Sequence, residues 1–498
     1  MSRAANPSPA PAMARLLLAL CLLLPALAGR ADPAPSLPVK LREVPAPNAT
    51  DRSAALATAP DGTVWLAWIE PTSGGNALRC ATLDAAAAEW SAPRTITQDA
   101  NFAAGQPAFT VASDGRLTAA WTIQTGPADQ TSLRFSQSTD RGRTWSPPAP
   151  LARGGPSSAS VSLQALADDR VLAAWRDGSG DSSLFTRCLG DVQADRRVES
   201  AGHGEGSAGL AAFPNGTALL AGFSRATDGT GGLRVMRFEG NQWSAGPSLL
   251  PGEAQPAGEG PRLASAGGRA GIAWCVTMGG EARVQAAVSP DAGNRFLSPL
   301  RVDLGRPRGG VDVIMLADGT LLVTWLEGGA QPGLWLRRIT PASELGGAVR
   351  LAALDPSPLA AVPRMTLVHD YEASPAQLAV VFGDNGSPAK LRTLLVTLPD
   401  RSTLAGRAPC VPCDEEDAAA VRGYPIKGRI IEVRPERAVL LVRHEEIPGV
   451  MRAMTMEFHA SPDILAEARP GRELLARIER RGSPWWIFGV RWLGAPTR

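Results

Sequence analysis

The sequence is poor in several residue types that mark particular protein classes. Among 498 residues there are two tyrosines and four histidines, and lysine occurs only at positions 40, 390 and 427. The formal net charge at pH 7 is only +2. This excludes the strongly basic surface that nucleic-acid binding requires, so we expect no nucleic-acid partner.

Cysteine is also scarce, with six residues in the chain. Cys80, Cys188 and Cys275 lie far apart, each in an apolar stretch that has the composition of a strand. This spacing excludes a disulfide framework and predicts three buried thiols that behave as small hydrophobes. Cys410 and Cys413 differ, because they form a C-x-x-C pair.

Long hydrophobic runs are absent, and no segment reaches the roughly 20 apolar residues of a membrane-spanning helix. At the N-terminus, Arg15 precedes the apolar stretch 16–24, and Ala26-Leu27-Ala28-Gly29 supplies a small-x-small site. These are the parts of a cleavable secretion signal. We therefore predict a signal peptide over residues 1–31, an exported mature protein and no stable membrane anchor.

The chain contains an internal repeat over residues 50–400, within a β-propeller domain expected at 32–400. Turn-forming pairs recur at intervals of 47 to 56 residues, and an aromatic residue follows each pair by seven or eight positions. The pairs begin at Asp61, Asp114, Asp168, Asn215, Gly267, Asp318 and, more weakly, Ser374. The aromatics are Trp68, Trp121, Trp175, Phe223, Trp274, Trp325 and Phe382. Such pairs supply the positive φ angles of tight hairpins.

Each repeat unit has room for four short strands, which is typical of β-propeller blades. No segment shows a sustained helical period. The fold class is therefore all-β, and we favour seven blades over six. The seventh unit lacks the closing Trp-Ser phrase of other units, and residues 39–44 are expected to supply its outer strand, which would remove the open edge of the ring.

Two units carry a sharper signature between their third and fourth strands. Ser138-Thr139-Asp140-Arg141-Gly142-Arg143-Thr144-Trp145 fits S-x-D-x-G-x-T-W, and residues 289–296 fit it with Arg295 and Phe296 as replacements. This pattern resembles the Asp-box (BNR) hairpin of sialidase-like propellers. The resemblance implies a propeller architecture and says little about chemistry.

The resemblance to sialidases does not extend to their catalytic residues. Sialidases use three arginines on the substrate carboxylate, a Tyr-Glu nucleophile pair and an aspartic acid-base. The propeller region has one tyrosine, in Tyr371-Glu372, and its arginines are too plentiful for three to be singled out. We assign no catalytic residues and expect a binding or scaffold role for the propeller, because a fold alone does not imply function.

A separate C-terminal domain is expected over residues 423–498, after a linker at 401–422 that contains the C-x-x-C pair. Five strands are predicted at 426–433, 439–443, 454–458, 473–478 and 485–490, with a short helical turn at 463–468. Five short strands in so small a domain predict an OB-like barrel.

The chemistry of this domain lies in the segment 444–458. Met454 and Met456 alternate with Thr455, so on a strand both thioethers face the same side. His444 ends the preceding strand and could join them. Thioether sulfur selects Cu(I) over harder divalent ions. An isolated Met-x-Met pair, however, is usually core filling.

The whole segment is closely similar to the CusF-type periplasmic copper-binding domains, whose mark is a His followed by Pro-Gly-x-Met-x-Ala-Met-Thr-Met-x-Phe. The resemblance covers about residues 423–494 and implies Cu(I) or Ag(I) binding by His444, Met454 and Met456. Members of the family place a Trp where Met451 stands, so Met451 is a further candidate ligand or cover. His459 is interpreted as a surface residue.

The pair Cys410 and Cys413 has three possible interpretations. The two cysteines could be auxiliary Cu(I) ligands, a redox pair or a small disulfide. The absence of a thioredoxin-like βαβ context argues against redox catalysis, and the sequence leaves the other two open. Our leading hypothesis is a periplasmic copper-handling protein that is not an enzyme, whose propeller docks a protein partner in copper transfer. The alternative is a secreted sialidase-like propeller that binds or hydrolyses glycans.

Overall fold

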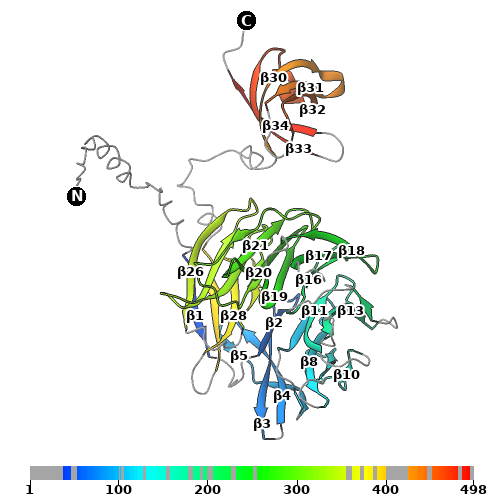
Figure 1. The fold of residues 1–498 in the computed structure, drawn as a ribbon, viewed down its shortest axis with the longest axis vertical. Coiled ribbons are helices and arrows are strands. Elements are labelled where there is room, and N and C mark those ends of the chain that lie inside the picture. The colour runs from blue at the N-terminus through cyan, green and yellow to red at the C-terminus, as the bar shows by residue number, and fades with distance from the viewer. Residues whose placement is uncertain are drawn as a thin grey trace, which may run out of the picture. The chain divides into compact units, whose positions relative to one another are not determined.

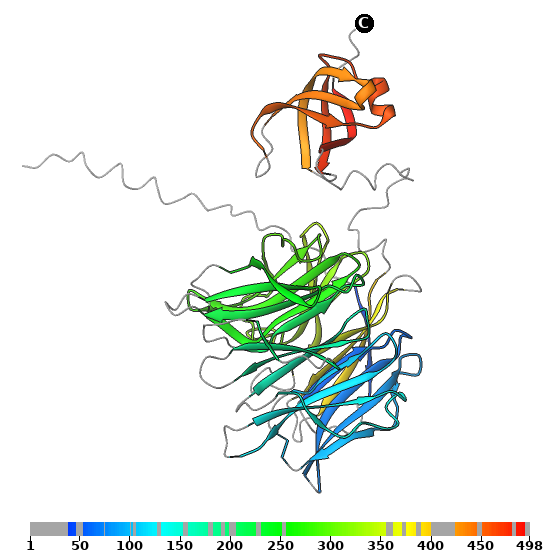
Figure 2. The same cartoon turned by 90° about the vertical axis from the view of Figure 1, so that its right-hand side faces the viewer.

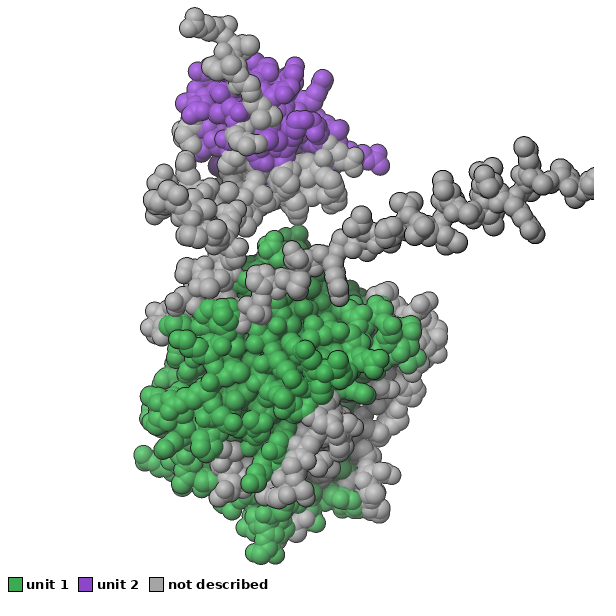
Figure 3. Space-filling model, turned by 90° about the vertical axis from the view of Figure 1, so that its left-hand side faces the viewer, with its two compact units in different colours: residues 1–404 green, residues 405–498 purple. Residues whose placement is uncertain are grey.

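The structure is a computed structural model. It describes residues 38–45, 53–73, 75–99, 101–102, 106–126, 131–152, 158–177, 183–190, 195–198, 206–225, 231–250, 255–354, 362–370, 375–384, 390–399, 424–445, 451–480 and 485–493. The chain divides into two compact units, residues 1–404 and 405–498, which Figure 3 colours separately. The predicted signal peptide and the pair Cys410 and Cys413 lie outside the described residues.

The first unit consists of seven antiparallel sheets, one for each predicted blade (Figure 1). Blade 1 contains β2 (Ala54–Thr58), β3 (Val64–Thr72), β4 (Gly75–Asp84), β5 (Glu89–Trp90) and β6 (Arg94–Asp99). Blade 2 contains β7 (Ala108–Val111), β8 (Leu117–Gln124), β9 (Thr131–Ser138) and β10 (Ala149–Pro150). Blade 3 contains β11 (Ser158–Ala165), β12 (Val171–Asp177), β13 (Leu184–Leu189) and β14 (Arg196–Arg197).

Blade 4 contains β15 (Gly209–Ala212), β16 (Ala218–Arg225), β17 (Gly231–Glu239) and β18 (Gln242–Ser248). Blade 5 contains β19 (Gln255–Ala266), β20 (Arg269–Met278), β21 (Glu281–Ser289) and β22 (Leu300–Arg301). Blade 6 contains β23 (Asp312–Met315), β24 (Leu321–Glu327), β25 (Gly333–Ile339) and β26 (Leu345–Ala353). Blade 7 contains β27 (Arg364–His369), β28 (Gln377–Gly383), β29 (Leu391–Thr397) and β1 (Lys40–Val44).

The innermost strands of the blades form a closed ring. The strands β2, β7, β11, β15, β19, β23 and β27 each contact the next, and β27 contacts β2. The sheets radiate from this ring, as the two views in Figures 1 and 2 show. The favoured seven-bladed arrangement is therefore confirmed, and the six-bladed alternative is wrong.

Six of the seven predicted turn pairs join the first and second strands of their blades, and Ser374 of the seventh lies outside the described residues. At the first pair, Gly62 has φ +82°, and the carboxylate of Asp61 accepts a hydrogen bond of 3.0 Å from the amide of Thr63. Because glycine adopts positive φ at no steric cost, these pairs set the hairpins. The seven predicted aromatics then lie on the second strands and are buried between blades, at most 3% exposed.

The N-terminal strand closes the ring as expected. β1 pairs with β29 from Lys40 opposite Thr397 to Val44 opposite Thr393. Arg42 also donates to the carbonyls of Ala86 and Ala87 in blade 1, at 3.0 and 2.9 Å. The last blade is thus completed by the start of the chain, and the free edge of β29 is covered.

In both Asp-box hairpins the aspartate carboxylate, of Asp140 or Asp291, accepts hydrogen bonds from backbone amides of its own turn. The carboxylate of Asp140 accepts from the amides of Arg143 and Thr144 at 3.0 and 2.9 Å and from the Thr144 hydroxyl at 2.7 Å. Gly142 has φ +72° and lies against the ring of Trp65, where a Cβ atom would approach within 3.2 Å. The turn is therefore fixed by aspartate and can pack against blade 1 because residue 142 lacks a side chain.

The second unit is a closed five-stranded barrel. Its strands are β30 (Tyr424–Arg434), β31 (Val439–His444), β32 (Met454–His459), β33 (Glu473–Arg480) and β34 (Trp485–Leu493), in the order β30-β31-β32-β34-β33. The 3-10 turn η2 (Pro435–Arg437) joins β30 to β31, and helix α2 (Pro462–Glu467) joins β32 to β33. Antiparallel pairing of β33 with β30 closes the barrel. This is the OB-like arrangement predicted from the sequence.

The scattered cysteines are free and buried, as predicted: Cys80, Cys188 and Cys275 each lie in a strand of a different blade. Burial raises the pKa of the Cys80 thiol to about 12 and that of Cys275 to about 11. Within the described part of the chain, no helix is both long and apolar enough to cross a bilayer.

Candidate functional site

The barrel brings His444 and Met454 together at one end. His444 is the last residue of β31, and the antiparallel register places it directly opposite Met454, the first residue of β32. Met456 lies opposite Val442, two residues further along the same face. Directly opposed side chains have Cβ atoms about 4.5–5.5 Å apart. The predicted imidazole and both predicted thioethers therefore share one side of a two-stranded ribbon.

The hydrogen bonding of His444 fixes its tautomer. Its Nδ1 atom lies 2.7 Å from the carbonyl oxygen of Glu445, and because a carbonyl only accepts, Nδ1 carries the proton. The Nε2 atom is buried and has no hydrogen-bond partner among the described residues. Metal-binding histidines commonly show this pattern, in which one nitrogen is oriented by a carbonyl and the other offers its lone pair.

The candidate sulfur ligands differ in exposure. Met454 is 50% exposed, whereas His444 is 2% exposed. Met451 and Met456 are partly buried and pack against the barrel core around Phe458. The edge of the His444 ring also faces Phe458, with ring centroids 5.9 Å apart. The two inner methionines therefore contribute to core packing in addition to any metal contact.

Two further aromatic or imidazole side chains lie away from this end of β32. His459 is at the opposite end of the strand, paired with Val439, and its ring lies 5.3 Å from that of Trp486. Strand alternation places His459 on the face opposite Met454 and Met456. Trp485 packs against the barrel core.

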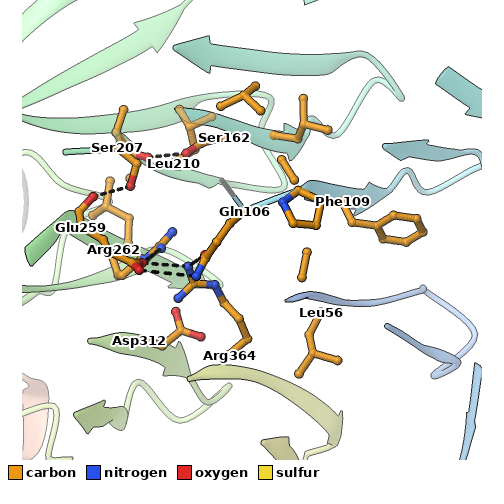
Figure 4. A pocket seen from close by; sticks show the side chains of 18 of the residues that line it. Leu56, Gln106, Phe109, Ser162, Ser207, Leu210, Glu259, Arg262, Asp312 and Arg364 are labelled. Atoms are coloured by element: carbon orange, nitrogen blue, oxygen red, sulfur yellow. Dashed lines mark hydrogen bonds and ion pairs between the residues drawn. The ribbon is translucent and has the colours of Figure 1, made fainter. Parts of the chain in front are cut away.

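A second candidate site lies on the axis of the propeller. A cavity of about 570 Å³ is lined by residues from all seven blades. Glu259 is its central polar group: its carboxylate accepts from Arg364 at 3.0 Å, Arg262 at 3.2 Å and the Gln106 amide at 3.4 Å. Figure 4 shows these side chains converging on Glu259.

Two more charged residues line the cavity. Asp312 is buried beside Arg364, accepts a hydrogen bond of 2.7 Å from the amide of Met365, and has its pKa raised by burial. Burial likewise lowers the pKa of Arg364 to about 10. Arg176 donates to the carbonyls of Gly206 and Phe223 at 3.0 and 2.6 Å. These contacts join the third and fourth blades, and the Arg176 guanidinium uses its donors on backbone carbonyls.

The sequence did not single out this axial cluster. Glu259, Asp312 and Arg364 are spaced 53 and 52 residues apart, which matches the repeat period. Applying that period to polar residues near the start of each inner strand would have found them. Tyr371 and Glu372, considered as a nucleophile pair, lie outside the described residues.

Among the described residues, no group of three or more His, Cys, Asp or Glu side chains could hold a metal ion. A metal site in the described barrel therefore depends on thioether sulfur. The C-x-x-C pair stays an untested prediction.

No protein-family model and no curated protein matches the chain, so the two family resemblances have no support from those sources. Similar solved structures include a protein of unknown function from Dyadobacter fermentans (11% identity, 72% of this chain and 99% of that one, TM-score 0.47). A Hadza microbial sialidase is also similar, at 13% identity over 70% of this chain and 65% of that one, with a TM-score of 0.41. An α-L-arabinofuranosidase from Fusarium graminearum is similar at 13% identity over 73% of this chain and 98% of that one, with a TM-score of 0.43. At TM-scores below 0.5 these similarities carry no argument, and the assignment of a seven-bladed β-propeller rests on the strand pairing of the chain itself.

Proposed function

We propose that the C-terminal barrel binds one Cu(I) or Ag(I) ion through His444, Met454 and Met456, as part of copper handling in the periplasm. The observation that carries the proposal is the buried Nε2 atom of His444, a residue directly opposite Met454; this atom has no hydrogen-bond partner in the described part of the chain. An unpaired buried polar atom is costly. A metal ion would satisfy it.

The donor set determines which ion fits. One neutral imidazole and two thioethers are soft, uncharged ligands, which suit a monovalent soft cation and disfavour the oxygen-preferring divalent ions. Met451 is the candidate for a fourth donor or for a cover over the ion.

The decisive experiment is a Cu(I) competition titration on the full chain against a chromophoric Cu(I) chelator. We expect tight binding by the wild type and at least tenfold weaker binding by Met454→Leu/Met456→Leu, equivalent to about 1.4 kcal/mol or more. Leucine keeps the volume and apolar character of both side chains, so the barrel should remain folded. Equal affinities would refute the site.

A second candidate function is favoured by the axial cavity of the propeller. Its polar network of Glu259, Arg262 and Arg364 and its volume of about 570 Å³ suit a polar ligand such as a glycan. Because Glu259 already accepts from both arginines, a ligand carboxylate would compete with it. Glycan binding by wild type and Arg364→Met tests this function, and turnover of a fluorogenic sialoside, with Tyr371→Phe as control, tests for hydrolysis.

A further inference from the structure

We propose that the ion enters and leaves the barrel on the Met454 side, by exchange of this thioether for a sulfur donor on an anionic partner. This inference rests on the proposed Cu(I) site. It adds which ligand is exchanged and which kind of partner the surrounding surface favours.

Accessibility distinguishes Met454 from the other candidate ligands. Met454 is 50% exposed and His444 2% exposed. Both line one cavity of about 380 Å³, whereas Met451 and Met456 are not among its lining residues. A donor atom from another molecule can therefore approach the proposed ion from the side of Met454, while His444 holds the ion from within the barrel.

The charges around this cavity are unbalanced. Lys427 and Glu445 form an ion pair of 2.7 Å, and Arg429 and Glu473 form one of 2.6 Å. Arg443, which lines the same cavity, is exposed and forms no ion pair with another residue in the described parts of the chain. The cavity therefore has one surplus positive charge, which favours an anionic partner.

The exchange step is a ligand substitution without electron transfer. A thiolate of the partner forms a bond to Cu(I), the bond between Cu(I) and the Met454 sulfur breaks, and the thioether returns neutral to solvent. The metal stays monovalent throughout. The partner loses its thiol proton to solvent before the attack, because the thiolate is the nucleophile.

The test measures the rate at which the Cu(I)-loaded full chain loses its ion to small thiols of different charge. Mercaptosuccinate is anionic and cysteamine is cationic. We expect mercaptosuccinate to react faster when rates are compared at equal thiolate concentration. Arg443→Glu should reduce this preference about tenfold at low ionic strength, with a smaller effect at high salt.

Lys390→Glu is the matched control, because it makes the same change in net charge at an exposed position in the propeller. Its ratio of the mercaptosuccinate rate to the cysteamine rate should equal that of the wild type. An unchanged preference in Arg443→Glu would overturn the inference. Failure of the proposed function itself is distinguishable, since the wild type would then not bind Cu(I) at equilibrium.

The role of Met454 has its own readout. With methyl-13C-methionine in Ag(I)-loaded protein, limiting thiol should return the Met454 methyl resonance toward its metal-free position before that of Met456. If the Met456 resonance returned first, or if both resonances returned together at every thiol concentration, the exchange would be assigned to another ligand.

Discussion

His444 lies directly opposite Met454 in the pairing of β31 with β32. Its Nδ1 atom is held by the carbonyl of Glu445, and its buried Nε2 atom has no partner among the residues that the structure describes. A core histidine without a metal role would be expected to use both nitrogens or to expose one. This arrangement instead presents a lone pair beside a half-exposed thioether. The predictions below follow from this relationship and from the polar network on the propeller axis.

Gly428 sets the spacing behind His444. It is paired with His444 across β30 and β31, and a Cβ atom there would lie 2.7 Å from Val442 Cγ1 and 2.8 Å from the Arg443 carbonyl. Gly428→Ala should therefore displace β31 and weaken Cu(I) binding several-fold with every ligand retained. Competition titration and melting temperature measure the two effects. Gly268→Ala is the control, because no atom lies within 4 Å of a Cβ atom added at this position. It should change neither the Cu(I) affinity nor the melting temperature.

The Arg364–Glu259 pair should be energetically coupled. Removing Arg364 leaves the Glu259 and Gln106 oxygens with fewer donors in the axial cavity, so Arg364→Met should cost about 1–3 kcal/mol of unfolding free energy. In a double-mutant cycle with Glu259→Gln, we expect a coupling energy of about 0.5–3 kcal/mol. Urea unfolding provides the measurement, and additive effects would show that the pair is not coupled. Lys390→Met, on the surface, should change stability by less than about 0.5 kcal/mol.

The Asp-box predicts a specific acid sensitivity. Hydrogen bonds from the hydroxyl and amide of Thr144 hold the pKa of Asp140 below its ordinary value. The unfolded chain therefore binds the proton more readily. The stabilisation is present above about pH 4 and is lost as the pH falls through the folded-state pKa. Asp140→Asn should lower the melting temperature at pH 7 and flatten its decline below pH 4. Glu344→Gln, at an exposed position, should leave the wild-type profile unchanged.

The buried thiols should be silent in the folded protein. Cys80 and Cys275 are 0% and 5% exposed, and burial raises their pKa values to about 12 and about 11. Since the thiolate is the reactive and metal-binding form, neither should react with a disulfide reagent at pH 8 until guanidinium unfolds the chain. Mass spectrometry of labelled peptides distinguishes them from Cys410 and Cys413. Rapid labelling of Cys80 or Cys275 in native buffer would contradict the packing described here.

The fold could be predicted from the sequence because its signals are local and repeated. A turn pair such as Asp61-Gly62 and an aromatic such as Trp68 are fixed by backbone conformation and strand alternation, and their recurrence gives the number of blades. The closing role of β1 followed from the missing outer strand of the last unit. The sequence also indicated that His444 ends one strand and Met454 begins the next, but their direct pairing came from the structure.

The axial network could not be predicted in the same way. Glu259 and Arg364 are single polar residues on different blades, 105 positions apart. Only the repeat period relates them, because no local motif surrounds either one. They meet only because the ring closes, which is a property of the whole propeller. The partner-free Nε2 atom of His444 also required the structure, because its hydrogen bonding depends on the carbonyl of Glu445.

X-ray absorption spectroscopy of the Cu(I)-loaded full chain tests the central claim most directly. The account predicts sulfur neighbours together with one imidazole nitrogen, and a loss of sulfur scattering in Met454→Leu/Met456→Leu. A copper environment made only of nitrogen and oxygen, unchanged by that double substitution, would contradict it.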